Sequence, residues 1–323
     1  MTDKNSKSGN LLSNYITTAG KHSAYDESCK RLLANKQILA QILQMCVEEF
    51  RNCSVKDIEE KYIEGSPEIA KVAVHQDENG EFIKGMNTED ATMTEGKVTF
   101  DIRFHAIAPQ DERQIGLILN LEAQNDFYTG YPLVKRGIYY GSRLISAQYG
   151  TEFYESGYEK IKKVYSIWIC TCPPRYRRNT ITSYSFEEKN LIGQANEKKE
   201  NYDLITVVMV CLGESDSSNY SGLLKMLDVL LSNEKKPEEK KWILHNEFNI
   251  AMSKNMESEV SDMCNLSQAI WQQGVDDAMI DSILKIMDNL KKNVSEAMDI
   301  LEIPHADRDG YLKIIEEKRA KNL

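Results

Sequence analysis

The sequence has no long hydrophobic run. Its longest apolar stretch, Ile205–Leu212 (ITVVMVCL), is interrupted only by Thr206 and is far shorter than the roughly 20 residues that cross a bilayer. The first twenty residues are rich in Ser, Thr, Asn and Lys and lack the apolar core of a signal peptide. We therefore expect a cytoplasmic protein with no membrane partner, and we interpret Ile205–Leu212 as a fully buried strand.

Cysteine and histidine are few and scattered. Seven cysteines and five histidines are dispersed over 323 residues, mostly in apolar contexts. Only Cys170 and Cys172 lie close together, and no second pair completes the spacing of a zinc site. We expect reduced, buried thiols, and neither a zinc site nor a histidine-based catalytic site.

The chain also lacks a positive net charge, which at −10 argues weakly against a nucleic-acid partner. The charge is uneven, however. Residues 135–178 contain nine basic and three acidic residues, whereas residues from 214 onward contain 14 basic and 21 acidic ones. A polyanion responds to the local potential, so the basic stretch is a candidate DNA-binding surface. Ordinary solvated faces explain it about equally well.

Composition divides the chain into three parts. Residues 1–22 are polar and are expected to form a disordered tail. Residues 23–213 alternate helical and strand patterns, which predicts an α/β domain with a small mixed sheet. Residues 214–323 carry helical segments joined by short polar breaks. We expect an all-α region there, with homo-oligomerisation as one use for it.

The elements of the α/β part follow from the period of its apolar residues. We expect a long amphipathic helix over 25–50, a short helix starting at Ser54, and a loop or hairpin over 77–97. Another helix is expected within 130–150, with a buried stripe of Val134, Ile138, Gly141 and Ile145. The expected strands cover 98–106, 117–124, 163–172 and 203–212, and an extended arm covers 181–193.

Three polar residues stand out in the first two of these strands. Glu122 and Gln124 project to the same side because side chains on a strand repeat every two residues. Antiparallel pairing through the intervening turn brings Asp101 alongside them. Two carboxylates and an amide oxygen suit Mg²⁺ or Mn²⁺, and the Ala123 carbonyl offers a further ligand. Alternatively, these residues form the wet face of the sheet, although the hydrophobic strand around Glu122 disfavours an edge position.

The same segments resemble a known family. TFDIRFHA…GLILNLEAQ, followed by RGIYYGSRLISAQYGTEFYESGYEKIKKVYSIWIC, is similar to the PD-(D/E)xK nuclease superfamily. The similarity is closest to its recombination-promoting nuclease, or PD-(D/E)xK transposase, branch and covers about residues 23–315. It implies a restriction-endonuclease-like αβββαβ core followed by helices. It also implies a Mg²⁺-dependent DNA endonuclease, linked to mobile-element or recombination activity.

The resemblance implies roles for individual residues. Asp101, Glu122 and the Ala123 carbonyl would hold the metal, and Gln124 would stand where the superfamily's name has Lys. Because Gln124 carries no charge, it can only orient a water or a phosphate oxygen. The metal would then supply most of the activation for hydrolysis to a 5′-phosphate and a 3′-hydroxyl.

Further candidates lie on the neighbouring helix and loop. Arg136 would clamp a phosphate, and Tyr139 or Tyr140 would contact a sugar, base or phosphate. Two tyrosines at helical spacing are, however, more often core residues. Contacts to the DNA backbone are expected from Arg143, Arg175, Arg177 and Arg178.

The first helix is expected to add an acidic residue to the site. Asp26 matches the YD-x-x-x-K pattern best, and Glu48 and Glu49 are rivals. Asp26 alternatively occupies the first helical turn because the helix dipole favours it there.

Two other functions are compatible with the sequence. One is a DNA-binding or regulatory relative that does not cleave, and the other is a helical oligomerisation module on a nuclease scaffold. Metal-dependent cleavage distinguishes an endonuclease from the first, and metal binding distinguishes it from the second.

Overall fold

The structure is a computed structural model that describes residues 24–65, 67–69, 89–92, 96–99, 101–110, 113–124, 127–215, 218–232 and 235–321. The chain divides into two compact units. The larger unit is Asp26–Ser261, and the smaller one contains the described residues from Asp262 onward. The expected tail over 1–22 lies outside the described residues.

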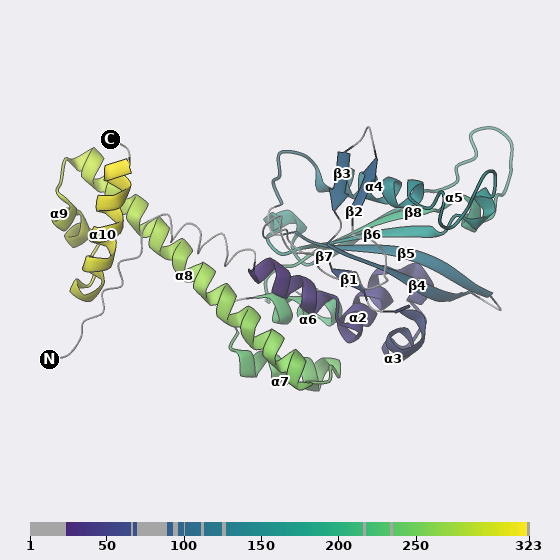
Figure 1. The fold of residues 1–323 in the computed structure, drawn as a ribbon, viewed down its shortest axis with the longest axis horizontal. Helices are drawn as coiled ribbons and strands as arrows, with labels where there is room; N and C mark the ends of the chain where they lie inside the picture. Colours follow the sequence, from purple (N-terminus) through teal and green to yellow (C-terminus); the bar gives the residue numbers. More distant parts are fainter. Residues whose placement is uncertain are drawn as a thin grey trace. The chain divides into compact units, whose positions relative to one another are not determined.

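A mixed six-stranded sheet forms the centre of the larger unit (Figure 1), which confirms the α/β class. Its strand order is β1-β4-β5-β6-β8-β7, in which β5, β6 and β8 run parallel to one another and the other pairs are antiparallel. The strands are β1 (Glu68–Ile69), β4 (Ile102–Gln110), β5 (Arg113–Gln124), β6 (Lys163–Cys170), β7 (Thr180–Tyr184) and β8 (Ile205–Cys211). Since β1 has only two residues, five strands make up most of the sheet.

The four strands expected from the sequence are all present, with two differences. The turn between β4 and β5 is shorter than expected, because both strands extend toward it. Part of the extended arm expected over 181–193 is instead the strand β7, which pairs with β8. The central strands β6 and β8 are buried along almost their whole length, as is usual for parallel strands covered on both faces.

Helix α4 (Leu133–Ser146) covers one face of the sheet and packs against β6 and β8. The predicted stripe on this helix is only partly buried, because Gly141 is buried and Val134 and Ile145 pack against the core, but Ile138 is exposed. The helix lies too close to the sheet for a side chain at Gly137, where a Cβ would come 2.6 Å from Val207 Cγ1. The buried stripe is therefore Leu133, Gly137, Tyr140, Gly141 and Leu144.

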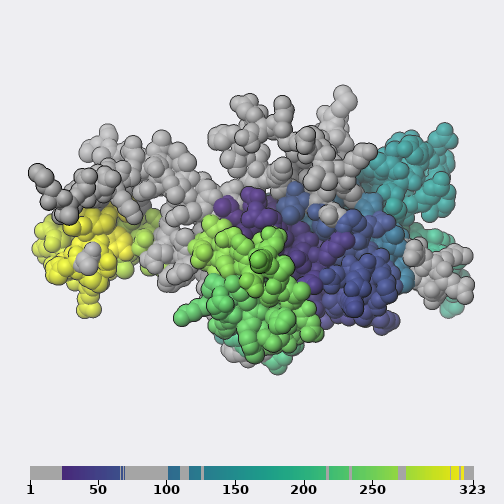
Figure 2. All heavy atoms as spheres, turned by 60° about the horizontal axis from the view of Figure 1, so that its bottom comes forward, coloured from purple at the N-terminus to yellow at the C-terminus, as the bar shows by residue number. Residues whose placement is uncertain are grey.

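The N-terminal helices belong to the same unit as the first two helices after β8. The helix expected over 25–50 is interrupted, because Asn35 caps α2 (Lys36–Cys46) by accepting a hydrogen bond from the Gln37 N–H at 2.9 Å. Gln41 Nε2 donates to the Phe248 carbonyl at 3.2 Å, so segments distant in sequence lie side by side, as the purple and green surfaces in Figure 2 show. The remaining elements are η1 (Glu48–Phe50), α3 (Val55–Asp57), η2 (Ile58–Tyr62), η3 (Tyr158–Lys160), η4 (Arg175–Arg177), α5 (Lys199–Tyr202), α6 (Gly222–Leu231) and α7 (Pro237–Phe248).

The region after Gly213 is helical, as expected, but α6 and α7 lie within the larger unit rather than with the helices that follow. Helix α8 (Lys254–Leu290) extends into the smaller unit, which also contains α9 (Val294–Ile300) and α10 (His305–Lys321). Its core includes Ile283, Met298 and Ile315. No helix among the described residues is long and apolar enough to cross a membrane.

Two smaller expectations are confirmed. Within the stretch 77–97, β2 (Glu89–Thr92) pairs antiparallel with β3 (Gly96–Thr99), although residues 77–88 are not described. All seven cysteines are free thiols, and all except Cys53 and Cys172 are buried.

Candidate active site

Asp101 and Glu122 lie side by side at one edge of the sheet. Since Ile102 pairs with Leu121 in the antiparallel β4–β5 ladder, Asp101 falls directly beside Glu122. The backbone N–H of Asp101 donates to Glu122 Oε1 at 3.1 Å, and the N–H of Ala123 donates to Asp101 Oδ2 at 3.2 Å. The carboxyl-terminal ends of the parallel strands β5, β6 and β8 lie at this end of the sheet, which we call the carboxyl edge. The predicted juxtaposition of the two carboxylates is therefore present.

A lysine from the N-terminal helical residues 24–33 joins the two carboxylates. Lys30 Nζ lies 2.9 Å from Asp101 Oδ1 and 2.6 Å from Asp26 Oδ2, and its side chain is almost completely buried. Asp26 and Lys30 are one helical turn apart, so both face the sheet edge. The structure thus brings Asp26 to the site, through Lys30.

The buried charges change the protonation equilibria of the site. Glu122 is only 4% exposed, and burial together with the nearby charge of Asp101 raises its pKa well above the ordinary value. Burial lowers the pKa of Lys30, but Asp101 and Asp26 more than offset this effect, so its pKa is raised. Burial also raises the pKa of Cys29 to about 12, which makes this neighbouring thiol unreactive.

Arg136 approaches the same edge from α4. Its Nη2 donates to the Tyr140 hydroxyl at 2.8 Å and its Nη1 to the Tyr131 hydroxyl at 3.4 Å. Its guanidinium carbon lies 5.2 Å from the ring centre of Trp168, which is a cation–π distance. The charge of Arg136 acts on Glu122 by lowering its pKa, so the guanidinium belongs to the carboxylate site.

The remaining candidates on β5 and α4 have different environments. Gln124 is half-buried at the end of β5, and its carbonyl accepts the Thr171 N–H at 3.1 Å. Tyr140 is buried against Trp168, with ring centres 5.5 Å apart, so it is partly a core residue. Tyr139 is exposed on the outer face of the helix.

The four arginines expected to contact DNA do not behave alike. Arg143 is only 3% exposed, which contradicts its expected role, because the last turn of α4 turns this residue into the protein. Arg178 forms an ion pair with Glu214, and Arg177 donates to the Tyr184 hydroxyl at 3.1 Å. Arg175 is exposed.

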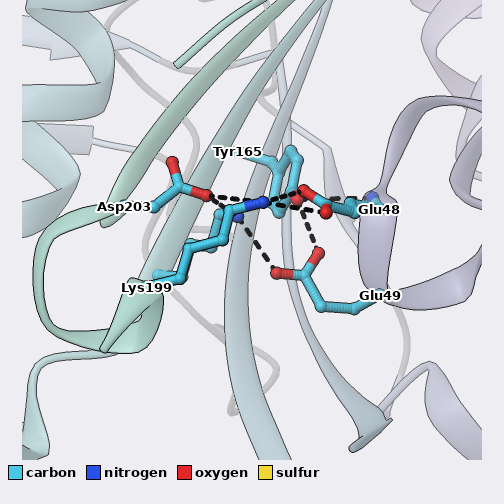
Figure 3. A network of polar contacts seen from close by, with 6 residues as sticks. Glu48, Glu49, Tyr165, Lys199 and Asp203 are labelled. Atoms are coloured by element: carbon cyan, nitrogen blue, oxygen red, sulfur yellow. Dashed lines mark hydrogen bonds and ion pairs between the residues drawn. The ribbon is translucent and has the colours of Figure 1, made fainter. Parts of the chain in front are cut away.

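Glu48 and Glu49, the rivals of Asp26, lie at the opposite edge, where β6 and β8 begin (Figure 3). Lys199 Nζ lies 2.6 Å from Glu48 Oε2, and Tyr165 donates to Glu49 Oε2 at 2.5 Å. Lys163 Nζ lies 3.1 Å from Glu49 Oε1 and 2.7 Å from Asp203 Oδ2, so it links these two carboxylates. We call this the amino-edge cluster; its acidic residues are separate from the candidate site.

Sequence reasoning assigned no role to Lys30, Tyr131 or Trp168. The YD-x-x-x-K pattern contained a signal for Lys30, because a lysine four residues after an aspartate shares its helix face. Trp168 was predictable only as a strand residue. Its place under Arg136 depends on the pairing of β5 with β6, which sets Glu122 opposite Trp168.

The donor set suits a hard divalent cation in part. Asp101, Glu122 and the Ala123 carbonyl are oxygen donors, and Mg²⁺ commonly uses one or two carboxylates and completes its shell with water or phosphate. Among the described residues, no group of three Asp, Glu, His or Cys side chains is arranged to hold a metal. Lys30 also contacts oxygens that such an ion would use.

No protein-family model matches the chain, and neither a curated protein nor a solved structure matches it. The case for a function therefore depends on the geometry of the site.

Proposed function

We propose that this protein is a metal-dependent DNA endonuclease of the PD-(D/E)xK type. The observation that carries the proposal is the hydrogen-bonded pair of Asp101 and Glu122 at the carboxyl edge. Carboxylates so close together repel each other, and folding holds them there with Lys30 and backbone N–H groups. Two carboxylates held this close together favour the binding of a cation, whereas without one their repulsion destabilises the fold.

The order of elements supports the same proposal. The N-terminal helices are followed by β1, β4 and β5, then by α4 and β6, with the β2–β3 hairpin inserted before β4. Apart from the inserted hairpin, this order is compatible with the αβββαβ order that the resemblance implies. The two carboxylates lie on adjacent strands of it, and Arg136 lies on the following helix.

Each residue has a defined task in this proposal. Asp101, Glu122 and the Ala123 carbonyl would hold Mg²⁺ or Mn²⁺, which supplies a Lewis acid and lowers the pKa of a bound water. Arg136, oriented by Tyr140 and Trp168, binds a phosphate oxygen through its remaining N–H groups. Gln124 orients a water or a phosphate oxygen from the end of β5.

A second candidate is a DNA-binding relative that does not cleave. The observation that favours it is the position of Lys30, whose ammonium group forms ion pairs with both Asp101 and Asp26. If Lys30 stays there, the carboxylates have little affinity for a second cation. In an active enzyme, Lys30 would instead give up its ion pair with Asp101, lie beside the cation and contact a phosphate oxygen.

Cleavage of supercoiled plasmid with Mg²⁺, Mn²⁺ or EDTA tests the proposal. The wild-type protein is expected to nick or linearise the plasmid only with a metal. Asp101→Ala is expected to reduce the rate by at least ~100-fold, and Gln124→Ala by less.

Lys163→Arg is the control, because it alters the amino-edge cluster and leaves the proposed site intact. Cleavage that persists at the wild-type rate in Asp101→Ala would contradict the proposal. DNA binding by a folded protein that cleaves with neither metal would favour the second candidate.

A further inference from the structure

Exposed tyrosines gather beside the carboxylate site. The residues 127–132, FYTGYP, join the end of β5 to the start of α4 and so connect the strand of Glu122 to the helix of Arg136. Tyr128 is 71% exposed, and Tyr131 is also exposed while its hydroxyl accepts a hydrogen bond from Arg136. Phe127 packs on the core under this loop. Two rings therefore point outward from an anchored loop next to the site.

A third exposed ring lies after the neighbouring strand β6. Tyr176 in η4 is 77% exposed and is flanked by Arg175 and Arg177. The hydrogen bond from Arg177 to Tyr184 holds η4 against β7. Since β5 and β6 are adjacent and parallel, and the Thr171 N–H bonds to the Gln124 carbonyl, both tyrosine groups start from the carboxyl edge.

Basic residues flank these rings along the chain, although Glu214 pairs with Arg178 and the Glu122 carboxylate lies close to Arg136. The stretches 127–136 and 170–184 contain five basic residues, Lys135, Arg136, Arg175, Arg177 and Arg178, and no acidic residue. Positive charge attracts the phosphate backbone of any nucleic acid. Exposed flat rings add something more specific, because a base can stack on them only if its own face is free.

Base-paired DNA hides the faces of its bases in the helical stack, so exposed tyrosines gain little from a duplex. An unpaired strand offers each base face in turn. Exposed aromatic rings with interleaved basic residues are the combination that binds single strands with little sequence preference.

We propose that the carboxyl edge of the sheet binds unpaired DNA, with Tyr128, Tyr131 and Tyr176 as stacking platforms for bases next to the Asp101–Glu122 pair. The inference rests on the proposed function, because it names the form of DNA that this site receives. Single-stranded regions, flaps and frayed ends are the corresponding substrates.

Binding of fluorescently labelled oligonucleotides tests the inference directly. The anisotropy of a 20-nucleotide single strand is compared with that of the duplex of the same sequence, in EDTA so that no cleavage occurs. We expect the single strand to bind at least ~10-fold more tightly than the duplex, as loss of base stacking on a tyrosine typically changes affinity by that order.

The variants Tyr128→Ala and Tyr176→Ala are expected to weaken single-strand binding by about 5–10-fold each and to leave duplex binding unchanged. Tyr128→Phe and Tyr176→Phe keep the ring and are expected to bind as the wild type does. Tyr154→Ala is the matched control, because Tyr154 is 65% exposed but lies in the segment that leads to the start of β6.

Equal affinity for single strand and duplex would overturn the inference. So would a loss of binding in Tyr154→Ala as large as that in Tyr128→Ala. Plasmid cleavage keeps the two proposals separate. A protein that cleaves duplex DNA with Mg²⁺ but has no preference for single strands retains the proposed function and loses this inference. A protein that binds single strands through these tyrosines but never cleaves DNA retains this inference and loses the proposed function.

Discussion

The two edges of the central sheet both gather buried charge, but they balance it differently. In the amino-edge cluster, Lys163 lies between Glu49 and Asp203, and Lys199 pairs with Glu48 (Figure 3). At the carboxyl edge, Lys30 pairs with Asp101, while among the described residues Glu122 forms no ion pair. Each carboxylate of the amino-edge cluster has a lysine partner, whereas Glu122 at the carboxyl edge has none among the described residues.

The difference appears in the protonation of the glutamates. The hydrogen bond from Lys199 lowers the pKa of Glu48, whereas burial and the charge of Asp101 raise the pKa of Glu122. A buried acid without a cation destabilises the fold when it ionises. We interpret the amino-edge cluster as structural and the carboxyl edge as functional, because strained electrostatics of this kind is typical of sites that bind or react.

The largest expected effect comes from breaking the amino-edge cluster. Lys163→Met would leave Asp203, which is 3% exposed, and Glu49 without their shared cation. We expect the free energy of unfolding to fall by about 3–5 kcal/mol, measured by denaturant titration. Adding Asp203→Asn is expected to restore part of the loss. A loss below about 1 kcal/mol would mean that the cluster is too well hydrated to be structural.

The next effect concerns the contact that places Arg136 at the carboxyl edge. Gly137→Ala adds a Cβ 2.6 Å from Val207 Cγ1 and 3.1 Å from Trp168 Nε1, so α4 must move away from the sheet. We expect a loss of about 1–3 kcal/mol in thermal or chemical unfolding, together with slower cleavage. Gly274→Ala in α8 is the control, because nothing lies within 4 Å of its added Cβ. That variant is expected to be about 0.5–1 kcal/mol more stable.

Replacement of Glu122 is expected to have a smaller effect on the free energy of unfolding, and to raise it rather than lower it. Because the folded state raises the pKa of this acid, folded protein binds its proton more tightly than the unfolded chain does. Stability therefore falls as pH rises from the unfolded pKa of about 4.3 through the higher folded pKa, and it is lowest above both.

Glu122→Gln removes that penalty while its amide oxygen can still accept the Asp101 N–H. In EDTA at pH 8 we expect the variant to be at least ~1 kcal/mol more stable than the wild type, with no difference below about pH 4. Melting curves across this pH range provide the measurement. A variant that is less stable at pH 8 would show that the ionised Glu122 is stabilised by its surroundings, as the carboxylates of the amino-edge cluster are by their lysines.

The smallest effect is expected at the surface of the amino-edge cluster. Lys199 and Glu48 are both more than half exposed, so water and salt screen their ion pair. Lys199→Ala is expected to change stability by no more than about 0.5 kcal/mol, and less at high salt. A loss as large as that of Lys163→Met would mean that the two lysines act as one unit.

Much of the fold was predictable because strand and helix periods are local. The alternation over Ile102–Ala106 and Leu117–Ala123 predicted two paired strands, and their register brings Asp101 to Glu122 as expected. Other features depend on packing between segments that are far apart in the sequence, and they were not predictable. The stripe on α4 was partly mispredicted because the helix approaches the sheet through Gly137. Arg143 was expected at the surface, but the fold buries it.

By itself the sequence determined the α/β class and the pairing of the two acidic residues, since both depend on periods and spacings within short segments. Only the tertiary structure decided that Asp26 rather than Glu48 or Glu49 reaches the site, and that Lys30 comes with it. It also decided which charges are neutralised. Burial and ion pairing are properties of segments far apart in the chain, and no local pattern specifies which partner a charge meets.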